Sequence, residues 1–145
     1  MTPIYLGNWE CKEDMIADFS NVLKPDESCK YPPGSKEHMR WLNDKDKYEA
    51  AINSEEYKGN ILLASYETGN WEGEAFVLLE KEGKLYEINA SHCSCYGLED
   101  QWSPEETTVD ELNFRLTKGT FGRSDWNGKI ENTFANELNT ILNKL

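Results

Sequence analysis

The sequence predicts an α+β fold, in which a small antiparallel three-stranded sheet (a meander) is flanked by N- and C-terminal helices. Amphipathic stretches with helical spacing lie toward both ends, and three apolar runs of strand length lie between them. The 145 residues correspond to one domain, and 38% hydrophobic residues are too many for a disordered chain. We therefore expect a single domain over residues 1–145.

Two helices are expected in the first third of the chain. Residues 9–23 carry apolar residues at the spacing of one helical face, namely Met15, Ile16, Phe19, Val22 and Leu23. Residues 36–52 are rich in helix formers and follow a segment interrupted by prolines. We expect the second helix to bury Trp41, Leu42, Tyr48 and Ile52.

The middle of the chain reads as three strands. Residues 60–67 form one short apolar run, and residues 73–91 contain two more with an E-G-K turn between them. Ala75–Leu79 is apolar on both faces, which is typical of a central strand that is covered on each side. Gly83 occupies the turn position that needs a positive φ, so the second and third strands should form a hairpin.

The last third of the chain is expected to be helical. Ser103, Pro104 and Glu106 match a helix cap, a first-turn proline and a capping-box acid, and Thr108 with Glu111 forms an alternative start. The final segment places apolar residues on one helical stripe that should pack on the sheet: Ile130, Phe134, Leu138, Ile141, Leu142 and Leu145.

The charge balance is strongly acidic. The chain holds 27 Asp and Glu against 15 Lys and Arg, a net charge of −12. Such a surface repels nucleic acid and anionic membranes, and it suits a basic partner, a cationic ligand or simple solubility. No window is long and apolar enough for a membrane span, and the first residues lack the features of a secretory signal. We expect a cytoplasmic protein whose thiols stay reduced.

One acidic window stands out. Residues 85–114 contain no Lys or Arg and hold seven carboxylates, which are Glu87, Glu99, Asp100, Glu105, Glu106, Asp110 and Glu111. A field of one sign could steer a basic partner. The alternative is that acids gather in the first turn of a helix and offset its dipole, which fits Glu105, Glu106, Asp110 and Glu111. The first interpretation makes a partner-binding surface of Glu99, Asp100, Trp102, Glu105 and Glu106.

The segment SHCSCYGLEDQW, residues 91–102, concentrates potential metal ligands. Cys93 and Cys95 are two apart, so in extended backbone both side chains point to the same side and reach one ion. His92 needs a turn to join them, and Cys11 lies at the expected start of the first helix, where the helix dipole favours a thiolate. A structural zinc site takes four such ligands. We expect zinc bound by Cys93, Cys95, His92 and Cys11, with Cys29 and His38 as alternative ligands.

Other readings of this segment remain open. Reduced cysteines often act as small buried hydrophobes without a metal. A Cys–His nucleophile needs the two side chains within hydrogen-bond reach and an orienting third group, and a redox pair is usually C-x-x-C. Loops that cradle phosphate are absent, which disfavours nucleotide chemistry.

The run AFVLLEKEGKLYEINASHCSCYGLEDQWSPEETTVDEL, residues 75–112, resembles a family of small uncharacterised phage and prophage proteins. The shared features are two strands, an S-H-C-S-C-Y-G-L-E loop and a following Q-W-x-P-E-E-T-T segment. The resemblance extends to the C-terminal helix and loosely to the first helix, and it makes residues 29–58 a helical insertion. The family carries no activity that could be transferred.

Phage context implies a class of function by analogy, because small acidic phage proteins are frequently anti-restriction or anti-CRISPR proteins. We expect a non-enzymatic, zinc-stabilised inhibitor of a host defence system that binds a basic surface of a nucleic-acid-handling host protein such as a CRISPR effector nuclease. It would act in the cytoplasm of the infected cell without contacting nucleic acid or membrane directly. The alternatives are a small thiol- or zinc-dependent enzyme that uses His92, Cys93 and Cys95, and a structural protein of the phage.

Overall fold

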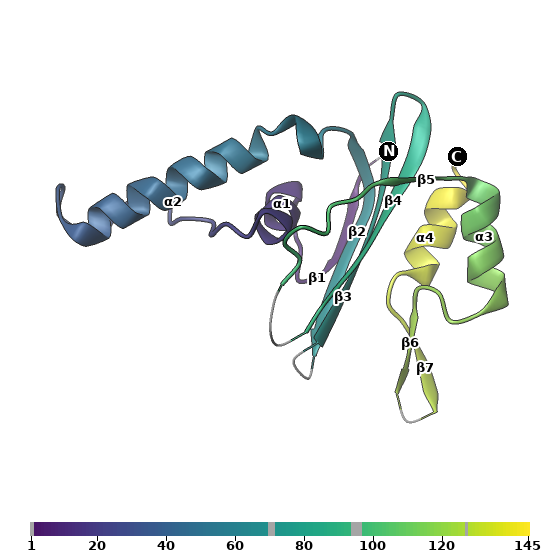
Figure 1. The fold of residues 1–145 in the computed structure, drawn as a ribbon. Coiled ribbons are helices and arrows are strands. Elements are labelled where there is room, and N and C mark those ends of the chain that lie inside the picture. The colour runs from purple at the N-terminus through teal and green to yellow at the C-terminus, as the bar shows by residue number, and fades with distance from the viewer. Residues whose placement is uncertain (1, 70–71, 94–96, 127) are drawn as a thin grey trace.

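The computed structural model describes residues 2–69, 72–93, 97–126 and 128–145. In this part of the chain a five-stranded sheet separates two helical layers, and one helix projects away from the body (Figure 1). The elements follow in the order β1 (Ile4–Gly7), α1 (Lys12–Ser20), α2 (Lys36–Ile52), a 3-10 turn (Glu55–Tyr57), β2 (Asn60–Gly69), β3 (Glu72–Lys81), β4 (Lys84–His92), β5 (Glu105–Thr107), α3 (Val109–Lys118), β6 (Arg123–Trp126), β7 (Lys129–Asn132) and α4 (Ala135–Leu142).

The class is α+β, but the predicted small three-stranded sheet is wrong. The main sheet has five strands in the order β1-β2-β3-β4-β5 and is mixed. The parallel pair is β1 with β2, where Ile4 lies opposite Leu63. The fifth strand, β5, pairs antiparallel with β4 and places Thr107 opposite Leu85. Strands β6 and β7 form a second, two-stranded sheet.

Strand β3 is the centre of the sheet, as its apolar sequence predicts. Val77 lies between Ala64 of β2 and Ile88 of β4 in the cross-strand register, and Ala75–Leu79 is buried throughout. The predicted hairpin between β3 and β4 is confirmed. Gly83 at φ 78° follows a residue that is also left-handed, which is the geometry of a two-residue hairpin turn.

Each face of the sheet carries its own hydrophobic cluster. On the α1 side, Trp9, Met15 and Phe19 pack on alternate residues of β2, β3 and β4. On the opposite side, α3 and α4 cover the sheet through a set of buried residues that includes Leu112 and Leu138. Figure 1 shows this division, with α1 on one face and the α3–α4 pair on the other.

Helix α1 is shorter than predicted. It ends at Ser20 and is capped by Asn21, whose φ of 53° is left-handed. The Val22 N–H donates to the Ala17 carbonyl at 3.0 Å. This pattern is a Schellman motif, which stops the helix and turns the chain away. Leu23, predicted on the apolar face, is instead 72% exposed.

The alternative start of the third predicted helix is the correct one. Thr108 caps α3, and its side chain accepts a hydrogen bond from the Glu111 N–H at 3.1 Å. The start at Ser103 is wrong, because the residues that would form its first turn, Glu105–Thr107, are extended and form β5.

Helix α2 has the predicted bounds and lacks the predicted burial. None of its residues is buried, and only Ala51 and Ile52, at its C-terminal end, pack on the α1-side cluster. We call residues 24–58 the arm and the remaining residues the body. In Figure 1 the helix extends from the body, and its N-terminal end lies farthest from the sheet.

The last predicted helix is split. Ile130 lies in β7 and is exposed, and only Ala135–Leu142 is helical. The joint between hairpin and helix is Gly122, whose carbonyl accepts from the N–H groups of Thr133, Phe134 and Ala135 at 2.9–3.0 Å. Gly122 has a φ of 76°, and a Cβ on it would lie 2.9 Å from the backbone of Ala135, so only glycine fits this joint.

Among the described residues, no helix combines the length and the apolar character that crossing a membrane requires.

Candidate functional site

The histidine-cysteine segment begins where β4 ends. His92 is the last residue of β4, and its Nδ1 lies 3.0 Å from the Cys93 carbonyl oxygen. Because a carbonyl only accepts, Nδ1 is the donor in this contact. Nε2 packs against Gly73, where even a Cβ would collide with the ring. Cys95 lies outside the described residues.

Gln101 closes this segment into a compact loop. Its Oε1 accepts from the Ser91 N–H at 2.9 Å, and its Nε2 donates to the Ser91 carbonyl at 2.7 Å and to the Gly97 carbonyl at 2.9 Å. The side chain thereby satisfies both backbone groups of Ser91, as a neighbouring strand would. Leu98 and Trp102 are buried and anchor the returning chain.

Beneath this loop, His92 belongs to a polar group on the α1 side. Its ring meets the Tyr66 ring edge-on, with centroids 5.7 Å apart. The Trp9 indole N–H donates to Asp18 Oδ2 at 2.7 Å. Burial raises the pKa of Asp18, and the Trp9 hydrogen bond and the charge of His92 only partly offset that rise. These contacts fix the imidazole within the body.

The predicted ligand set is not assembled in the part of the chain that the structure describes. No three His, Cys, Asp or Glu side chains there are grouped so as to hold a metal ion, so Cys11, His92 and Cys93 do not form such a group. Cys11 is the N-cap of α1, about 10 Å along the helix axis from Asp18, which interacts with His92. Burial raises the pKa of the Cys11 thiol. Zinc binding that involves Cys95 stays a prediction.

The structure does bring together the two alternative ligands, Cys29 and His38. Cys29 Sγ lies 3.4 Å from His38 Nδ1, within the arm. This pair is far from the loop in sequence and lies on the element that projects from the body (Figure 1).

The acidic window is less uniform than its sequence indicates. Glu87 is buried and forms a salt bridge with Arg115 of α3, which lies just beyond the window. Burial alone would raise the pKa of Glu87, but hydrogen bonds from Arg115 and Asn89 lower it below its ordinary value. Glu111 also pairs with Arg115, at 3.3 Å, and Glu106 lies 3.9 Å from Lys84.

The five predicted partner-binding residues do not form one surface: two lie in the cysteine loop, two lie on β5, and one is buried in the core. Glu99 and Asp100 belong to the cysteine loop, where Glu99 Oε2 accepts from a backbone N–H at 3.0 Å. Glu105 and Glu106 are exposed on β5. They pair with Glu87 and Tyr86 of β4, about 16–20 Å from the loop end of that strand. Trp102 is buried and donates its indole N–H to a backbone carbonyl of the arm at 2.8 Å.

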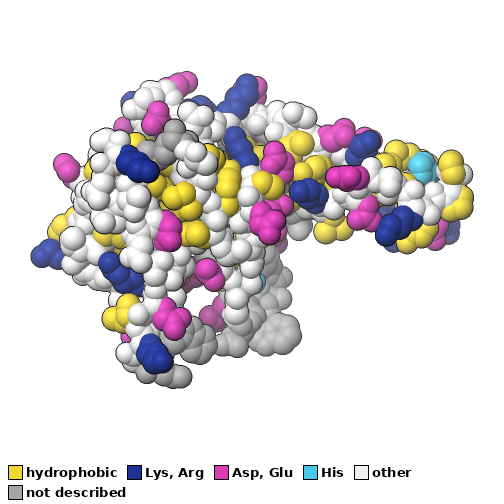
Figure 2. Space-filling view, turned by 180° about the vertical axis from the view of Figure 1, so that it is seen from behind, with side chains coloured by type: hydrophobic (Ala, Val, Ile, Leu, Met, Phe, Trp, Pro, Cys, Tyr) yellow, Lys and Arg dark blue, Asp and Glu magenta, His cyan; other side chains and the backbone are white. Residues whose placement is uncertain are grey.

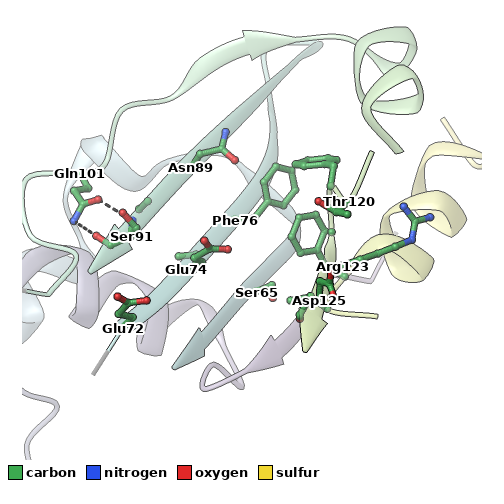
Figure 3. A pocket seen from close by; sticks show the side chains of 17 residues that line it. Ser65, Glu72, Glu74, Phe76, Asn89, Ser91, Gln101, Thr120, Arg123 and Asp125 are labelled. Carbon is green, nitrogen blue, oxygen red and sulfur yellow. Dashed lines mark hydrogen bonds between the residues drawn. The ribbon is translucent and has the colours of Figure 1, made fainter. Parts of the chain in front are cut away.

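A cleft of about 810 Å³ opens on the α3–α4 side, between the sheet and the β6–β7 hairpin. Figure 3 shows Glu72 and Glu74 of β3 on one side of it and Asp125 of β6 on the other. The space-filling view shows a hollow beside the hairpin, with Asp and Glu side chains at its border (Figure 2). All three carboxylates are exposed.

The cleft is negatively charged although Arg123 lines it. The Arg123 guanidinium donates to the Leu116 carbonyl at 3.0 Å and to the Gly119 carbonyl at 3.4 Å, at the C-terminal end of α3. Its positive charge therefore interacts with the negative end of the α3 dipole. In Figure 3 its side chain points away from Glu72 and Glu74.

The cleft also has an aromatic wall and a buried hydroxyl. The Phe76 and Phe134 rings are stacked with centroids 4.5 Å apart, and Phe121 meets both edge-on. Ser65 lines the cleft and is 1% exposed. Its Oγ has no hydrogen-bond partner among the described residues. An unpaired buried hydroxyl is costly, so a ligand that reached it would gain a hydrogen bond.

Comparison with protein-family models, curated proteins and solved structures finds no match to this chain. The resemblance to phage and prophage proteins stays a prediction.

The cleft is not predicted from the sequence, because its carboxylates come from segments far apart along the chain. One signal was present: Glu72, Glu74 and Phe76 alternate with small or apolar residues, so they share one face of β3. Asn89 and Ser91 likewise share one face of β4, opposite Phe76 and Glu74 of β3. Polar residues on the inner face at one end of a sheet indicate that the covering layer is open there.

Proposed function

We propose that this protein is a non-enzymatic binding module that docks its acidic body on a basic surface of a nucleic-acid-handling protein. The observation that carries the proposal is the separation of charge. The arm holds seven Lys and Arg and eight Asp and Glu, so the body holds eight cations against nineteen acids. Nearly all of the net charge of −12 therefore belongs to the body.

The cleft is the part of the body that suits a specific contact. Glu72, Glu74 and Asp125 offer carboxylates without a cation among the salt bridges of the described residues. The stacked rings of Phe76 and Phe134 supply apolar surface beside them. An Arg or Lys side chain of the partner could pair with a carboxylate and lie along the rings.

The partner class follows from chemistry and from analogy. Proteins that handle nucleic acids expose basic grooves for phosphate, and an acidic body competes for such a groove. Together with the resemblance to phage proteins, this supports inhibition of a host defence enzyme such as a CRISPR effector nuclease. In this proposal the inhibitor works by occupying the groove, and it needs no catalytic group.

The test is binding to a purified CRISPR effector nuclease loaded with its guide RNA. The cleft variant Glu72→Gln/Glu74→Gln/Asp125→Asn should bind at least about tenfold more weakly than the wild type. The matched control is Glu37→Gln/Asp46→Asn/Glu49→Gln, which removes the same charge from the arm and should bind as the wild type does.

A third variant separates the cleft from the loop and edge-strand acids. Glu99→Gln/Asp100→Asn/Glu105→Gln removes three carboxylates elsewhere on the body. If this variant loses affinity and the cleft variant does not, the contact lies at the predicted loop surface. Equal binding by all variants and the wild type, or no binding at low salt to effectors of several types, would contradict the proposal.

A further inference from the structure

Cys29 and His38 are held together by the local structure at the outer end of the arm. His38 lies in the first turn of α2, and Cys29 lies in the irregular segment that precedes it. Ser35 caps this turn, because its Oγ accepts from the His38 N–H at 3.2 Å and donates to the Pro32 carbonyl at 2.7 Å. The pair is 3.4 Å apart, from Sγ to Nδ1.

Trp41 fixes the imidazole from the other side. Its ring stacks on His38 with centroids 6.1 Å apart and an interplanar angle of 24°. Its indole N–H donates to the Asp26 carbonyl at 3.0 Å, which ties the irregular segment to α2. The two side chains are therefore positioned before any ligand arrives, and less ordering is required when one binds.

The separation of the two donors matches a zinc site. Zn–S and Zn–N bonds of about 2.3 and 2.0–2.1 Å at tetrahedral angles place the sulfur and nitrogen about 3.6 Å apart. The pair in the arm is 3.4 Å apart. A thiol–imidazole hydrogen bond has a similar length, so the experiment below must distinguish the two.

Two ligands do not complete a structural zinc site, which takes four. Within the described residues no third His, Cys, Asp or Glu side chain joins this pair in a metal-binding group. The arm of one chain therefore does not complete the site. A second copy of the chain, related by a two-fold axis, supplies a second Cys29 and a second His38 and completes a Cys₂His₂ set.

The surface around the pair suits a second copy. Tyr31 is 54% exposed and Met39 is 58% exposed, and α2 contains no buried residue. Figure 2 shows hydrophobic side chains gathered at the outer end of the arm. Two arms carry almost no net charge, whereas two bodies repel one another, so an approach through the arms is the one with the least electrostatic cost.

We propose that a zinc ion joins two copies of this chain through Cys29 and His38 of each copy. Each thiol releases one proton to solvent as its sulfur binds the ion, so two protons leave per zinc. Each imidazole binds in its neutral form. The site is independent of the cleft and of the predicted zinc ligands in the cysteine loop.

The experiment is a zinc titration of untagged, metal-free protein followed by sedimentation and light scattering. The mass should double from 16.7 kDa and reach its maximum when one zinc is bound at this site per two chains. Cobalt in place of zinc should give the intense visible bands of a tetrahedral site with sulfur ligands. Cys29→Ser and His38→Gln should each abolish the metal-induced dimer and keep the circular dichroism of the wild type.

The control is Cys93→Ser/Cys95→Ser, which should still dimerise with zinc even if it binds less metal in total. A chain that stays monomeric at every zinc concentration would overturn the proposal, because the pair would then be only a hydrogen bond. A zinc-induced dimer that survives in Cys29→Ser, or is lost in the loop variant with its fold intact, would equally overturn it.

Discussion

Removing Arg115 should destabilise the protein far more than an ordinary surface substitution does. Arg115 is the cation that pairs with the buried carboxylate of Glu87. The side chain of Glu87 is 7% exposed, and Asn89 Nδ2 is left as a donor to it at 2.8 Å. In Arg115→Ala the carboxylate would stay buried without a charged partner.

The expected loss of unfolding free energy has two parts, the unpaired carboxylate of Glu87 and the lost contact with Phe121. Breaking a buried ion pair by removing one partner costs about 3–5 kcal/mol. Arg115 also lies over the Phe121 ring at 4.8 Å, and a cation–π contact adds about 0.5–1 kcal/mol at a partly exposed site. For a chain of this size, each kcal/mol lowers the melting temperature by roughly 2–4 °C. We expect a decrease of about 10 °C or more at neutral pH.

The stability difference between the wild type and Arg115→Ala should depend on pH. The folded-state pKa of Glu87 is lowered in the wild type. Its pair therefore contributes stability above the unfolded-state pKa, and this contribution is lost as the pH falls through the folded-state pKa. In Arg115→Ala, burial should raise the pKa of Glu87, so protonation relieves the unpaired charge. The stability deficit of the variant should shrink as the pH falls through that raised value.

The assay is thermal and denaturant unfolding of the wild type and Arg115→Ala between neutral and acid pH. The double variant Glu87→Leu/Arg115→Leu is the control, since replacing both partners by apolar residues should cost much less than removing one. A loss below about 1 kcal/mol at neutral pH, or a deficit that grows on acidification, would refute the reasoning.

Three further predictions test the local geometry. Gly122→Ala should cost about 2 kcal/mol or more in unfolding free energy, because the new Cβ meets backbone at 2.9 Å with a positive φ, whereas Gly119→Ala, with open space around it, should change little. Thr108→Ala should lose a helix cap worth about 1 kcal/mol, and Ser103→Ala, at the rejected start, should be neutral within about 0.5 kcal/mol by the same assay. Gln101→Ala should accelerate amide hydrogen exchange at the end of β4, and unchanged protection there would show that the side chain does not close the loop.

Local patterns predicted the elements whose signals are contained within a few residues. The bounds of α2 follow from helix propensity, the central position of β3 from a run that is apolar on both faces, and the Gly83 turn from turn chemistry. The Thr108 cap was available as one of two starts, and sequence alone did not choose between them. Ser103 has the same cap chemistry, but pairing of β5 with β4 holds its neighbourhood extended.

Long-range pairing explains what the sequence could not predict. Strand β1 has four residues and pairs in parallel with β2 more than fifty residues later, and short strands carry too little pattern to be recognised alone. In β7, Ile130 continues a helical stripe that the structure breaks, because Gly122 ties the hairpin to α4. The apolar residues of α2 also predicted a buried face, but α2 projects from the body.

For the candidate site, the sequence predicts the overall charge, but only the fold determines where the charged side chains lie. Composition predicted an acidic molecule, and only the fold separates a nearly neutral arm from an acidic body. The sequence places Trp102 in a polar segment and so predicts it on the partner-binding surface. Its ring instead packs edge-on against Phe19 and Tyr57 in the core. The carboxylates of the cleft come from β3 and β6, and the fold alone brings them together.

The most direct test of the acidic-body account is the association rate constant with a guide-loaded CRISPR effector nuclease, measured across ionic strength. Electrostatic steering predicts a rate that falls steeply as salt increases, with a weaker dependence for the cleft variant Glu72→Gln/Glu74→Gln/Asp125→Asn. The arm variant Glu37→Gln/Asp46→Asn/Glu49→Gln should retain the dependence of the wild type. A rate that does not change with salt, or a dependence that all three proteins share, would contradict the account.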